Sequence, residues 1–186
     1  SNGNVHACLE HCFALLDLAK KQKLKNVFVH VILDGRDAIF NSGIDFVKKL
    51  QDKMKEVKVG KIASISGRFY AMDRDNRWDR IEKAYSAIAC GMADAYFTDP
   101  LEATKASYDK KVYDEEFVPV VIGESGKPTA VVGPDDAVVF FNYRPDRARQ
   151  MTKAFILPGF NKFKCEYLKN LFFVSRYLSR GRIPKS

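Results

Sequence analysis

Residues 26–37 read Asn-Val-Phe-Val-His-Val-Ile-Leu-Asp-Gly-Arg-Asp, and this stretch sets the fold class of the chain. Its first eight residues form a continuous apolar run rich in β-branched side chains, which is typical of a strand buried on both faces in a parallel sheet. Asp34-Gly35 then ends the strand in a turn. Apolar residues at helical spacing predict one helix before the strand, over about 5–22, and another after it, over about 44–54. This order of elements indicates an α/β domain.

The same alternation continues through the rest of the chain. Further strands are expected over 61–66, 116–122, 136–143 and 171–175, and further helices over about 78–88, from about 98 and over about 145–155. Pro119 is expected to place its strand at a sheet edge, because proline donates no ladder hydrogen bond. The strand over 136–143 is expected to be buried. The sequence thus predicts a three-layer α/β domain over residues 1–175, with a mainly parallel sheet flanked by helices.

Composition excludes several classes of protein. With 46% hydrophobic and 12% aromatic residues over 186 positions, the chain is expected to be globular and to form one domain. No apolar stretch reaches transmembrane length and the N-terminus shows no signal-peptide pattern, so a cytoplasmic location without membrane contact is expected. Four scattered cysteines fit reduced thiols rather than a disulfide framework. Residues 176–186 form a basic tail of open role.

The formal net charge of +8 admits three kinds of partner, which are nucleic acid, an anionic membrane and acidic metabolites. Lysine supplies most of the excess and is spread along amphipathic segments, as it is on solvated helix faces. The arginines are interleaved with carboxylates rather than with exposed stacking aromatics, which argues against a nucleic-acid track. This arrangement favours a small, multiply charged anion.

Three arginines come directly after predicted strands, namely Arg36, Arg68 and Arg144. The carboxyl ends of parallel strands meet at one edge of a sheet, where ligands bind in such folds. Guanidinium is a permanent bidentate donor to phosphate and carboxylate. Arg144 and Arg147 also flank a predicted helix N-terminus, whose free N–H groups favour an anion. We therefore expect an anion pocket at this edge of the sheet.

Other interpretations stay open for these residues. The Asp-Gly-Arg-Asp motif at 34–37 is equally compatible with a turn that carries a surface ion pair. Arg74, Arg77 and Arg80 follow at helical spacing, and at least one of them is expected to face solvent or to pair with a neighbouring aspartate. His6, at the start of a helix, could approach the same edge of the sheet as a phosphate ligand or proton carrier.

Motifs for metals, nucleotides and nucleophiles are weak or missing in the sequence. Cys8 and Cys12 lie close to two histidines, but both cysteines fall on an apolar stripe and no second ligand cluster follows, which disfavours zinc. His30 lies within a strand and is interpreted as a satisfied core residue. The sequence contains neither G-x-G-x-x-G nor a P-loop, and no recognisable nucleophile–base pair or carboxylate cluster for metals.

Four segments carry a family resemblance. They are Ser1-Asn2-Gly3-Asn4-Val5-His6, Leu33-Asp34-Gly35-Arg36-Asp37, Gly67-Arg68-Phe69-Tyr70-Ala71-Met72-Asp73-Arg74-Asp75-Asn76-Arg77-Trp78 and Phe141-Asn142-Tyr143-Arg144-Pro145-Asp146-Arg147-Ala148-Arg149. Taken together, they resemble the phosphotransferase domain of cofactor-independent (2,3-bisphosphoglycerate-independent) phosphoglycerate mutase. The match runs in the family's order to about position 156, and the block at 67–78 is its most specific part.

The resemblance implies a function and a set of site residues. The family interconverts 3-phosphoglycerate and 2-phosphoglycerate, in glycolysis and gluconeogenesis, through a phosphoserine enzyme. Substrate contacts are implied for His6, Arg36, Asp37, Arg68, Arg74, Arg144 and Arg147. Among these, Asp37 is the candidate catalytic residue that handles the proton of the substrate hydroxyl. Arg149 is interpreted as a surface residue.

The resemblance also implies parts that lie outside this chain. A second, alkaline-phosphatase-like domain of the family holds two divalent metal ions, usually manganese (Mn), together with the serine nucleophile. No metal is expected on the present chain. We therefore expect a monomer that holds phosphoglycerate but does not complete the reaction alone.

The chain departs from the family pattern in places. The family's Gly-Gly-Val-His-Ser-His is replaced at residues 3–8 by Gly-Asn-Val-His-Ala-Cys, and Ala-Ile-Phe at 38–40 replaces Thr-Pro-Pro. Pro145 replaces an alanine, and the resemblance ends after Val174. An alternative function is a non-catalytic anion- or nucleic-acid-binding module on the same fold. The salt dependence of binding separates nucleic acid from phosphoglycerate as the ligand. Affinity for nucleic acid should fall steeply as the salt concentration rises, whereas affinity for phosphoglycerate in a pocket should fall less.

Overall fold

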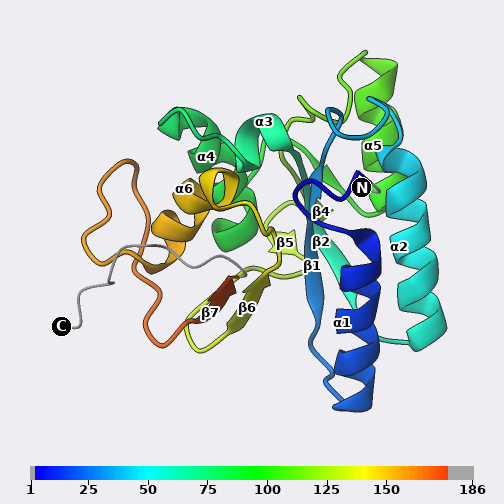
Figure 1. The fold of residues 1–186 in the computed structure, drawn as a ribbon, viewed down its shortest axis with the longest axis horizontal. Helices are drawn as coiled ribbons and strands as arrows, with labels where there is room; N and C mark the ends of the chain where they lie inside the picture. Colours follow the sequence, from blue (N-terminus) through cyan, green and yellow to red (C-terminus); the bar gives the residue numbers. More distant parts are fainter. Residues whose placement is uncertain (1–2, 176–186) are drawn as a thin grey trace.

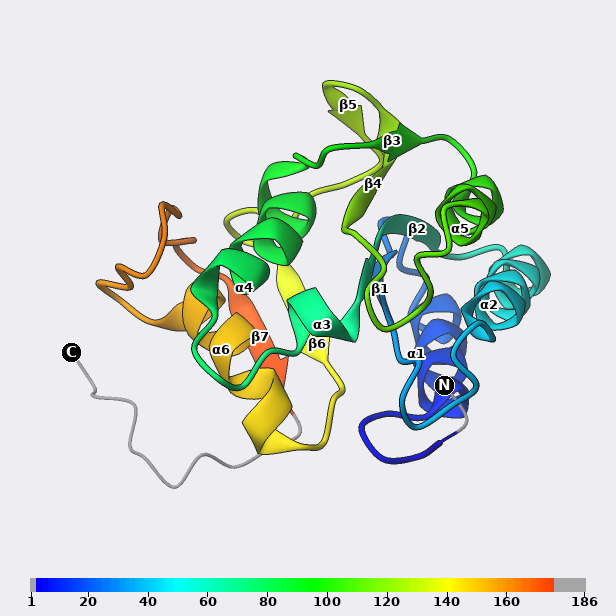
Figure 2. The ribbon, with the colours of Figure 1, turned by 90° about the horizontal axis from the view of Figure 1, so that it is seen from above.

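Helices cover both faces of a central sheet in the computed structural model, which describes residues 3–175 (Figure 1). The elements are, in chain order, α1 (Leu9–Lys21), β1 (Phe28–Leu33), α2 (Gly43–Val57), β2 (Lys61–Gly67), α3 (Arg68–Ala71), α4 (Trp78–Tyr85), the π-helical turn η1 (Ser86–Cys90), β3 (Tyr96–Phe97), α5 (Pro100–Asp109), β4 (Val120–Glu124), β5 (Lys127–Pro128), β6 (Ala137–Phe140), α6 (Pro145–Ile156) and β7 (Phe172–Ser175). Seen from above, α1, α2 and α5 lie on one side of the sheet, and α3, α4 and α6 lie on the other (Figure 2). The predicted α/β class with three layers is confirmed.

The strands form one five-stranded sheet and one two-stranded sheet. The larger sheet has the order β1-β2-β4-β3, with β5 paired to β4, and the smaller one joins β6 to β7. The pairs β1/β2, β3/β4 and β6/β7 are parallel, whereas β2/β4 and β4/β5 are antiparallel. Three of these five pairings are therefore parallel, while the two antiparallel ones join β4 to β2 and to β5 and make the larger sheet a mixed one.

Two apolar cores hold the layers together. The first packs α1, α2 and α5 against the large sheet and includes Leu16, Val47 and Ile65. The second lies between α4, α6 and the small sheet and includes Tyr85 and Phe155. Each fully buried side chain of this size stabilises the fold by about 1.5–3 kcal/mol. Among the described residues, no helix is both long enough and apolar enough to span a membrane.

The burial expected for two strands was wrong. β1 lies at an edge of the larger sheet, and of its side chains only Leu33 is buried. The strand buried along almost its whole length is β2, which has β1 on one side and β4 on the other. β6 is half exposed, with Val139 at 49%, because its only pairing among the described residues is with β7.

The edge position expected from Pro119 was also wrong. β4 lies in the interior of its sheet, between β2 and β3. Pro119 stands one residue before the first residue of β4, so its missing N–H removes no ladder hydrogen bond. The first helix begins at Leu9, later than expected, which leaves residues 3–8 as an irregular segment. The basic tail at 176–186 lies outside the described residues.

Candidate anion-binding site

The residues that follow β1, β2 and β6 meet at one edge of the structure. We call this edge the rim and define it as residues 3–6, 34–37, 68–77 and 141–147. The segment 3–6 is held tightly here, because a Cβ on Gly3 would lie 2.1 Å from the backbone oxygen of Asp37. The backbone N–H of Tyr143 donates to the backbone oxygen of His6 at 2.9 Å. Glycine at position 3 thus lets the N-terminal segment bridge the loops after β1 and β6.

Arg68 is the buried centre of the rim. It is 5% exposed, because it directly follows the buried strand β2 as the first residue of α3. Its Nη1 donates to Asp34 Oδ1 at 2.6 Å and to Asp37 Oδ2 at 2.7 Å. Burial would lower the pKa of Arg68, but the two aspartates outweigh it and raise the pKa. The guanidinium therefore stays charged and holds two carboxylates from the loop after β1.

His6 completes this buried cluster. Its Nε2 lies 2.9 Å from Arg68 Nη2 and 3.3 Å from Asp37 Oδ2. Burial, followed by the charge of Arg68, lowers the pKa of His6, although Asp37 acts in the opposite direction. The imidazole is then neutral at pH 7, with Nε2 as acceptor from Arg68 and the proton on Nδ1. Nδ1 is buried without a hydrogen-bond partner among the described residues.

A second, more exposed cluster joins the loop before α4 to the start of α6. Arg74 Nη1 donates to Asp146 Oδ2 at 3.0 Å, and Arg144 grips the same carboxylate through Nε at 3.3 Å and Nη2 at 3.2 Å. Burial would raise the pKa of Asp146, but hydrogen bonds from Arg74 and Arg144 outweigh it and lower the pKa. The carboxylate is thus ionised across the neutral pH range.

Arg147 lies among positive charges. Its Nη1 donates to the backbone oxygen of Met72 at 3.0 Å. Burial lowers the pKa of Arg147, and the charges of Arg74 and Arg68 lower it further. Asp146 offsets this only in part. An incoming anion would relieve this repulsion, so the electrostatics of the rim favour anion binding beside Arg147.

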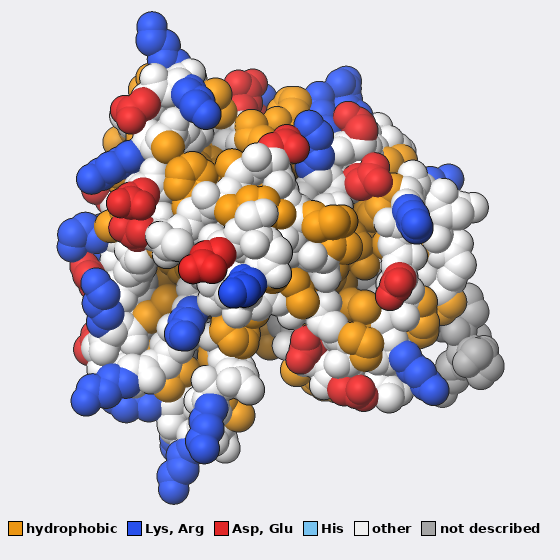
Figure 3. Space-filling model, turned by 180° about the vertical axis from the view of Figure 1, so that it is seen from behind, with side chains coloured by type: hydrophobic (Ala, Val, Ile, Leu, Met, Phe, Trp, Pro, Cys, Tyr) orange, Lys and Arg blue, Asp and Glu red, His pale blue; other side chains and the backbone are white. Residues whose placement is uncertain are grey.

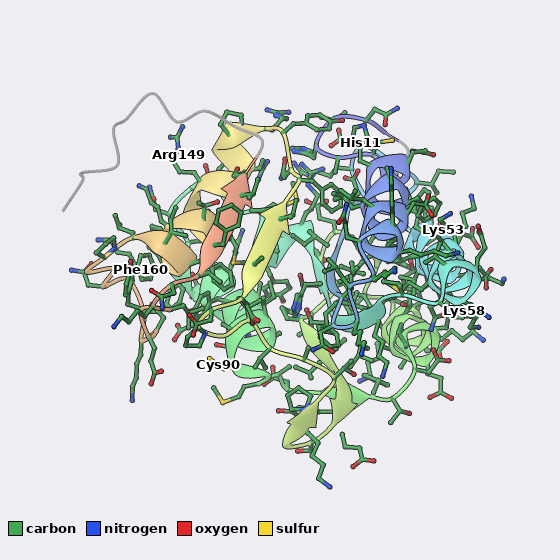
Figure 4. All side chains as sticks on the ribbon, turned by 90° about the horizontal axis from the view of Figure 1, so that it is seen from below. His11, Lys53, Lys58, Cys90, Arg149 and Phe160 are labelled. Atoms are coloured by element: carbon green, nitrogen blue, oxygen red, sulfur yellow. The ribbon has the colours of Figure 1, made fainter. Side chains whose placement is uncertain are left out.

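Arg36 and Asp37, neighbours in sequence, differ in setting. The Arg36 side chain is 58% exposed, and its Nε lies 2.6 Å from Glu115 Oε1. This contact is the surface ion pair that was the alternative interpretation of the motif. Asp37 instead faces Arg68 and His6 in the buried cluster. Arg149 is exposed on α6 and its side chain points away from the rim (Figure 4).

Several supporting residues were not found from the sequence. Asp73 is 3% exposed, and its Oδ2 accepts hydrogen bonds from the backbone N–H of Asp75 and Arg77 and from Gln150 Nε2. It therefore shapes the loop that carries Arg74 and ties it to α6. An aspartate followed by further polar residues is a signal for such a turn, but no local signal identifies a partner on a distant helix.

The described residues offer no metal centre, and the face seen from behind shows basic and acidic side chains together. Among residues 3–175, no group of three or more His, Cys, Asp and Glu side chains is arranged to hold a metal ion. They therefore do not fit the two divalent metals implied by the family resemblance. Seen from behind, Lys and Arg side chains are spread over the surface with Asp and Glu among them (Figure 3).

Comparison with known proteins identifies the family. The family model described as BPG-independent PGAM N-terminus (iPGM_N) matches residues 1–178. The chain belongs to this family. It is 49% identical over 168 residues to the 2,3-bisphosphoglycerate-independent phosphoglycerate mutase of Clostridium perfringens (strain 13 / Type A), a match that covers 90% of the chain and 33% of that protein.

Two further matches agree with this assignment. The enzyme of the same name from Listeria welshimeri is 46% identical over 180 residues, which covers 96% of the chain and 35% of that protein. A crystal structure of Leishmania mexicana phosphoglycerate mutase at low cobalt concentration superposes with a TM-score of 0.88 and 31% identity, covering 94% of the chain and 33% of that structure. The chain thus spans about a third of the length of these BPG-independent PGAM relatives.

Proposed function

We propose that this chain is the substrate-binding part of a BPG-independent phosphoglycerate mutase and holds 3-phosphoglycerate or 2-phosphoglycerate at the rim. One observation carries this proposal. Two segments far apart in sequence, 68–77 and 141–147, bring four guanidinium groups to the same edge of the structure as His6 and Asp37; the four belong to Arg68, Arg74, Arg144 and Arg147. Guanidinium groups are suited to the phosphate and carboxylate groups of such a ligand.

The two clusters suggest different roles. The exposed cluster around Arg74, Arg144 and Arg147 is accessible to solvent and would bind the anionic groups of the substrate. The buried cluster would position the glycerate hydroxyl, with Asp37 as the acceptor of its proton or hydrogen bond. Because Arg68 and His6 fix the position of the Asp37 side chain, this carboxylate would orient the hydroxyl. His6 Nδ1–H is a further donor for the ligand.

The rest of the reaction would need residues outside this chain. We infer that the serine nucleophile and the two divalent metal ions, manganese by resemblance, belong to the other two thirds of a full-length mutase. That phosphatase-like part would be the protein partner of the rim, and cytoplasmic glycolysis or gluconeogenesis would be the setting. The chain itself would be a monomer that binds substrate without turning it over.

Thermal protection by 3-phosphoglycerate tests this proposal. Ligand that binds only the folded state raises the melting temperature, by mass action. We expect 3-phosphoglycerate to protect the wild-type chain, and Arg144→Ala combined with Arg147→Ala to abolish the protection. Arg149→Ala is the matched control, because it removes an exposed arginine from the same helix. Equal protection of the double variant and the control would refute the assigned site.

A further inference from the structure

Asp146 occupies the groups that are best placed to bind an external anion. Its carboxylate accepts hydrogen bonds from Arg74 Nη1 and from Nε and Nη2 of Arg144. Asp146 itself lies in the first turn of α6, so this carboxylate stands at the helix N-terminus. A fork of guanidinium donors at the N-terminus of a twelve-residue helix is an arrangement that recognises phosphate or carboxylate.

The contacts of Asp146 are exposed and therefore inexpensive to break. The side chains of Arg74, Arg144 and Asp146 are 46%, 43% and 35% exposed. Ion pairs at such exposure contribute little to stability, because water and salt screen them. The Arg68 cluster contrasts with this one, since its side chain is only 6% exposed and its partner Asp34 only 13%. Of the two clusters, the one around Asp146 is the one that an incoming ligand can rearrange.

We propose that Asp146 is an internal competitor of the substrate, whose carboxylate holds Arg74 and Arg144 in the free protein and is displaced when an anionic group of phosphoglycerate takes its place. This inference rests on the proposed function and adds a residue that sets affinity and specificity at the same site. The displaced carboxylate returns to water, where its charge is solvated, so the exchange needs no change in the fold.

Such an exchange selects ligands by charge and shape. A monoanion with one weak acceptor gains little by replacing a carboxylate that is already bound through two oxygens. A phosphate monoester carries a charge of about −1.5 to −2 near pH 7 and presents three acceptor oxygens. It can therefore contact Arg147 as well as the two arginines released by Asp146. The carboxylate of glycerate has the same charge and the same two acceptor oxygens as Asp146. It would therefore bind Arg74 and Arg144 more tightly than Asp146 does only if its oxygens fitted them better.

Titration calorimetry on the whole chain tests the exchange. The wild type, Asp146→Asn and Asp75→Asn are each titrated with 3-phosphoglycerate, and with inorganic phosphate and glycerate to show which anionic group reaches the fork. Asp75→Asn is the matched control, because it removes one negative charge from an exposed side chain next to Arg74. We expect Asp146→Asn to bind 3-phosphoglycerate about three- to tenfold more tightly than wild type. The control should change affinity less than about twofold.

The outcomes separate this inference from the proposed function. If the wild type binds 3-phosphoglycerate and Asp146→Asn binds it no more tightly than Asp75→Asn, Asp146 does not compete and the inference is wrong, while the proposed function stands. If no variant binds 3-phosphoglycerate, the proposed function fails as well. A second readout is the carboxyl carbon resonance of Asp146 in the wild type. Its pKa should rise toward the ordinary value on saturation with 3-phosphoglycerate, and an unchanged pKa would contradict displacement.

Discussion

Arg68 holds the buried half of the rim together, because it neutralises Asp34 and Asp37 at 2.6 and 2.7 Å. Replacing it by alanine would leave both carboxylates without their cation in a poorly hydrated place. Breaking a buried pair in this way costs several kcal/mol, and the partial exposure of Asp37 reduces the cost. We expect Arg68→Ala to lower the free energy of unfolding by about 2–4 kcal/mol in urea denaturation.

The matched control for this variant is Arg149→Ala, which removes an exposed arginine and should change stability by less than about 0.5 kcal/mol. Arg68→Lys should restore only part of the loss, because an ammonium group cannot reproduce the planar guanidinium that contacts both aspartates through Nη1 and His6 through Nη2. A stability of Arg68→Ala within the range of the control would show that the buried cluster is not a stabilising unit.

His30 gives the fold a pH dependence. Its Nδ1 lies 2.8 Å from Ser64 Oγ, and burial lowers its pKa to about 4. Because the unfolded chain takes up this proton near pH 6.5, the unfolded state binds more protons between pH 6.5 and 4. Stability is therefore complete above about pH 6.5 and falls as the pH is lowered toward 4. Because His30 is only half-buried, we expect the free energy of unfolding to fall by no more than about 1–3 kcal/mol over this pH range.

Denaturant unfolding of the wild type and His30→Gln over this pH range checks the prediction. The variant should lose the larger part of the slope, with a remainder from His6, whose pKa is also lowered. Identical slopes in His30→Gln and wild type would contradict the assignment. The hydrogen bond to Ser64 agrees with the sequence interpretation of His30 as a satisfied residue, although the residue is half-buried rather than part of the core.

Asp73 connects the loop before α4 to helix α6 through its hydrogen bonds, and these bonds hold the backbone on either side of Arg74 in place. We expect Asp73→Ala to lower the free energy of unfolding by about 2–4 kcal/mol, because the N–H groups of Asp75 and Arg77 and the amide of Gln150 lose their acceptor. Hydrogen exchange at the Asp75 and Arg77 amides should accelerate. Asp79→Ala, at an exposed position of α4, is the control. Unchanged exchange at both amides would show that Asp73 does not hold the loop.

Elements with local signals could be predicted, and those defined by distant contacts could not. The helix expected from about residue 98 is α5, and Asp99 accepts the N–H of Leu101 as its cap, with Pro100 at the first helical position. At α2, Ser42 stands directly before the helix, but its hydroxyl donates to the Ile39 backbone oxygen and does not cap the helix. The first backbone N–H of that helix, from Gly43, donates to the carboxylate of Asp114. Asp114 is 71 residues away, so the sequence around the helix does not indicate this contact.

The three-layer α/β class of the molecule was predictable, because the helices and strands follow from hydrophobic periodicity. The burial of each strand was not, because it depends on the place of the strand in its sheet. β1 and β6 are apolar enough to be interior strands, yet the described chain leaves both half exposed. Arg68 and Arg144 lie at the same rim, but β2 and β6 belong to different sheets, so the rule for parallel strands of one sheet does not explain their approach. Their division into a buried and an exposed cluster was not predictable either, because it depends on contacts with Asp34 and Asp146 across the fold.

The molecule has a second surface that could bind an anion. Locating the bound phosphoglycerate therefore tests the proposal that it binds at the rim. A groove of about 410 Å³ at the other end of α2 is lined by Lys55, Lys58 and Lys61. It lies outside the rim and is not among the residues that the family resemblance implies. A phosphoglycerate attracted only by net positive charge would have no reason to prefer the rim to this groove.

Backbone and side-chain NMR shifts recorded during a 3-phosphoglycerate titration distinguish these two surfaces. We expect saturable changes that are largest at His6, Arg74, Arg144 and Arg147, with smaller ones at the buried Arg68. The lysines of the groove should shift little. Changes confined to Lys55, Lys58 and Lys61, or no saturable change at the rim, would contradict the proposal that this chain holds phosphoglycerate through its arginines.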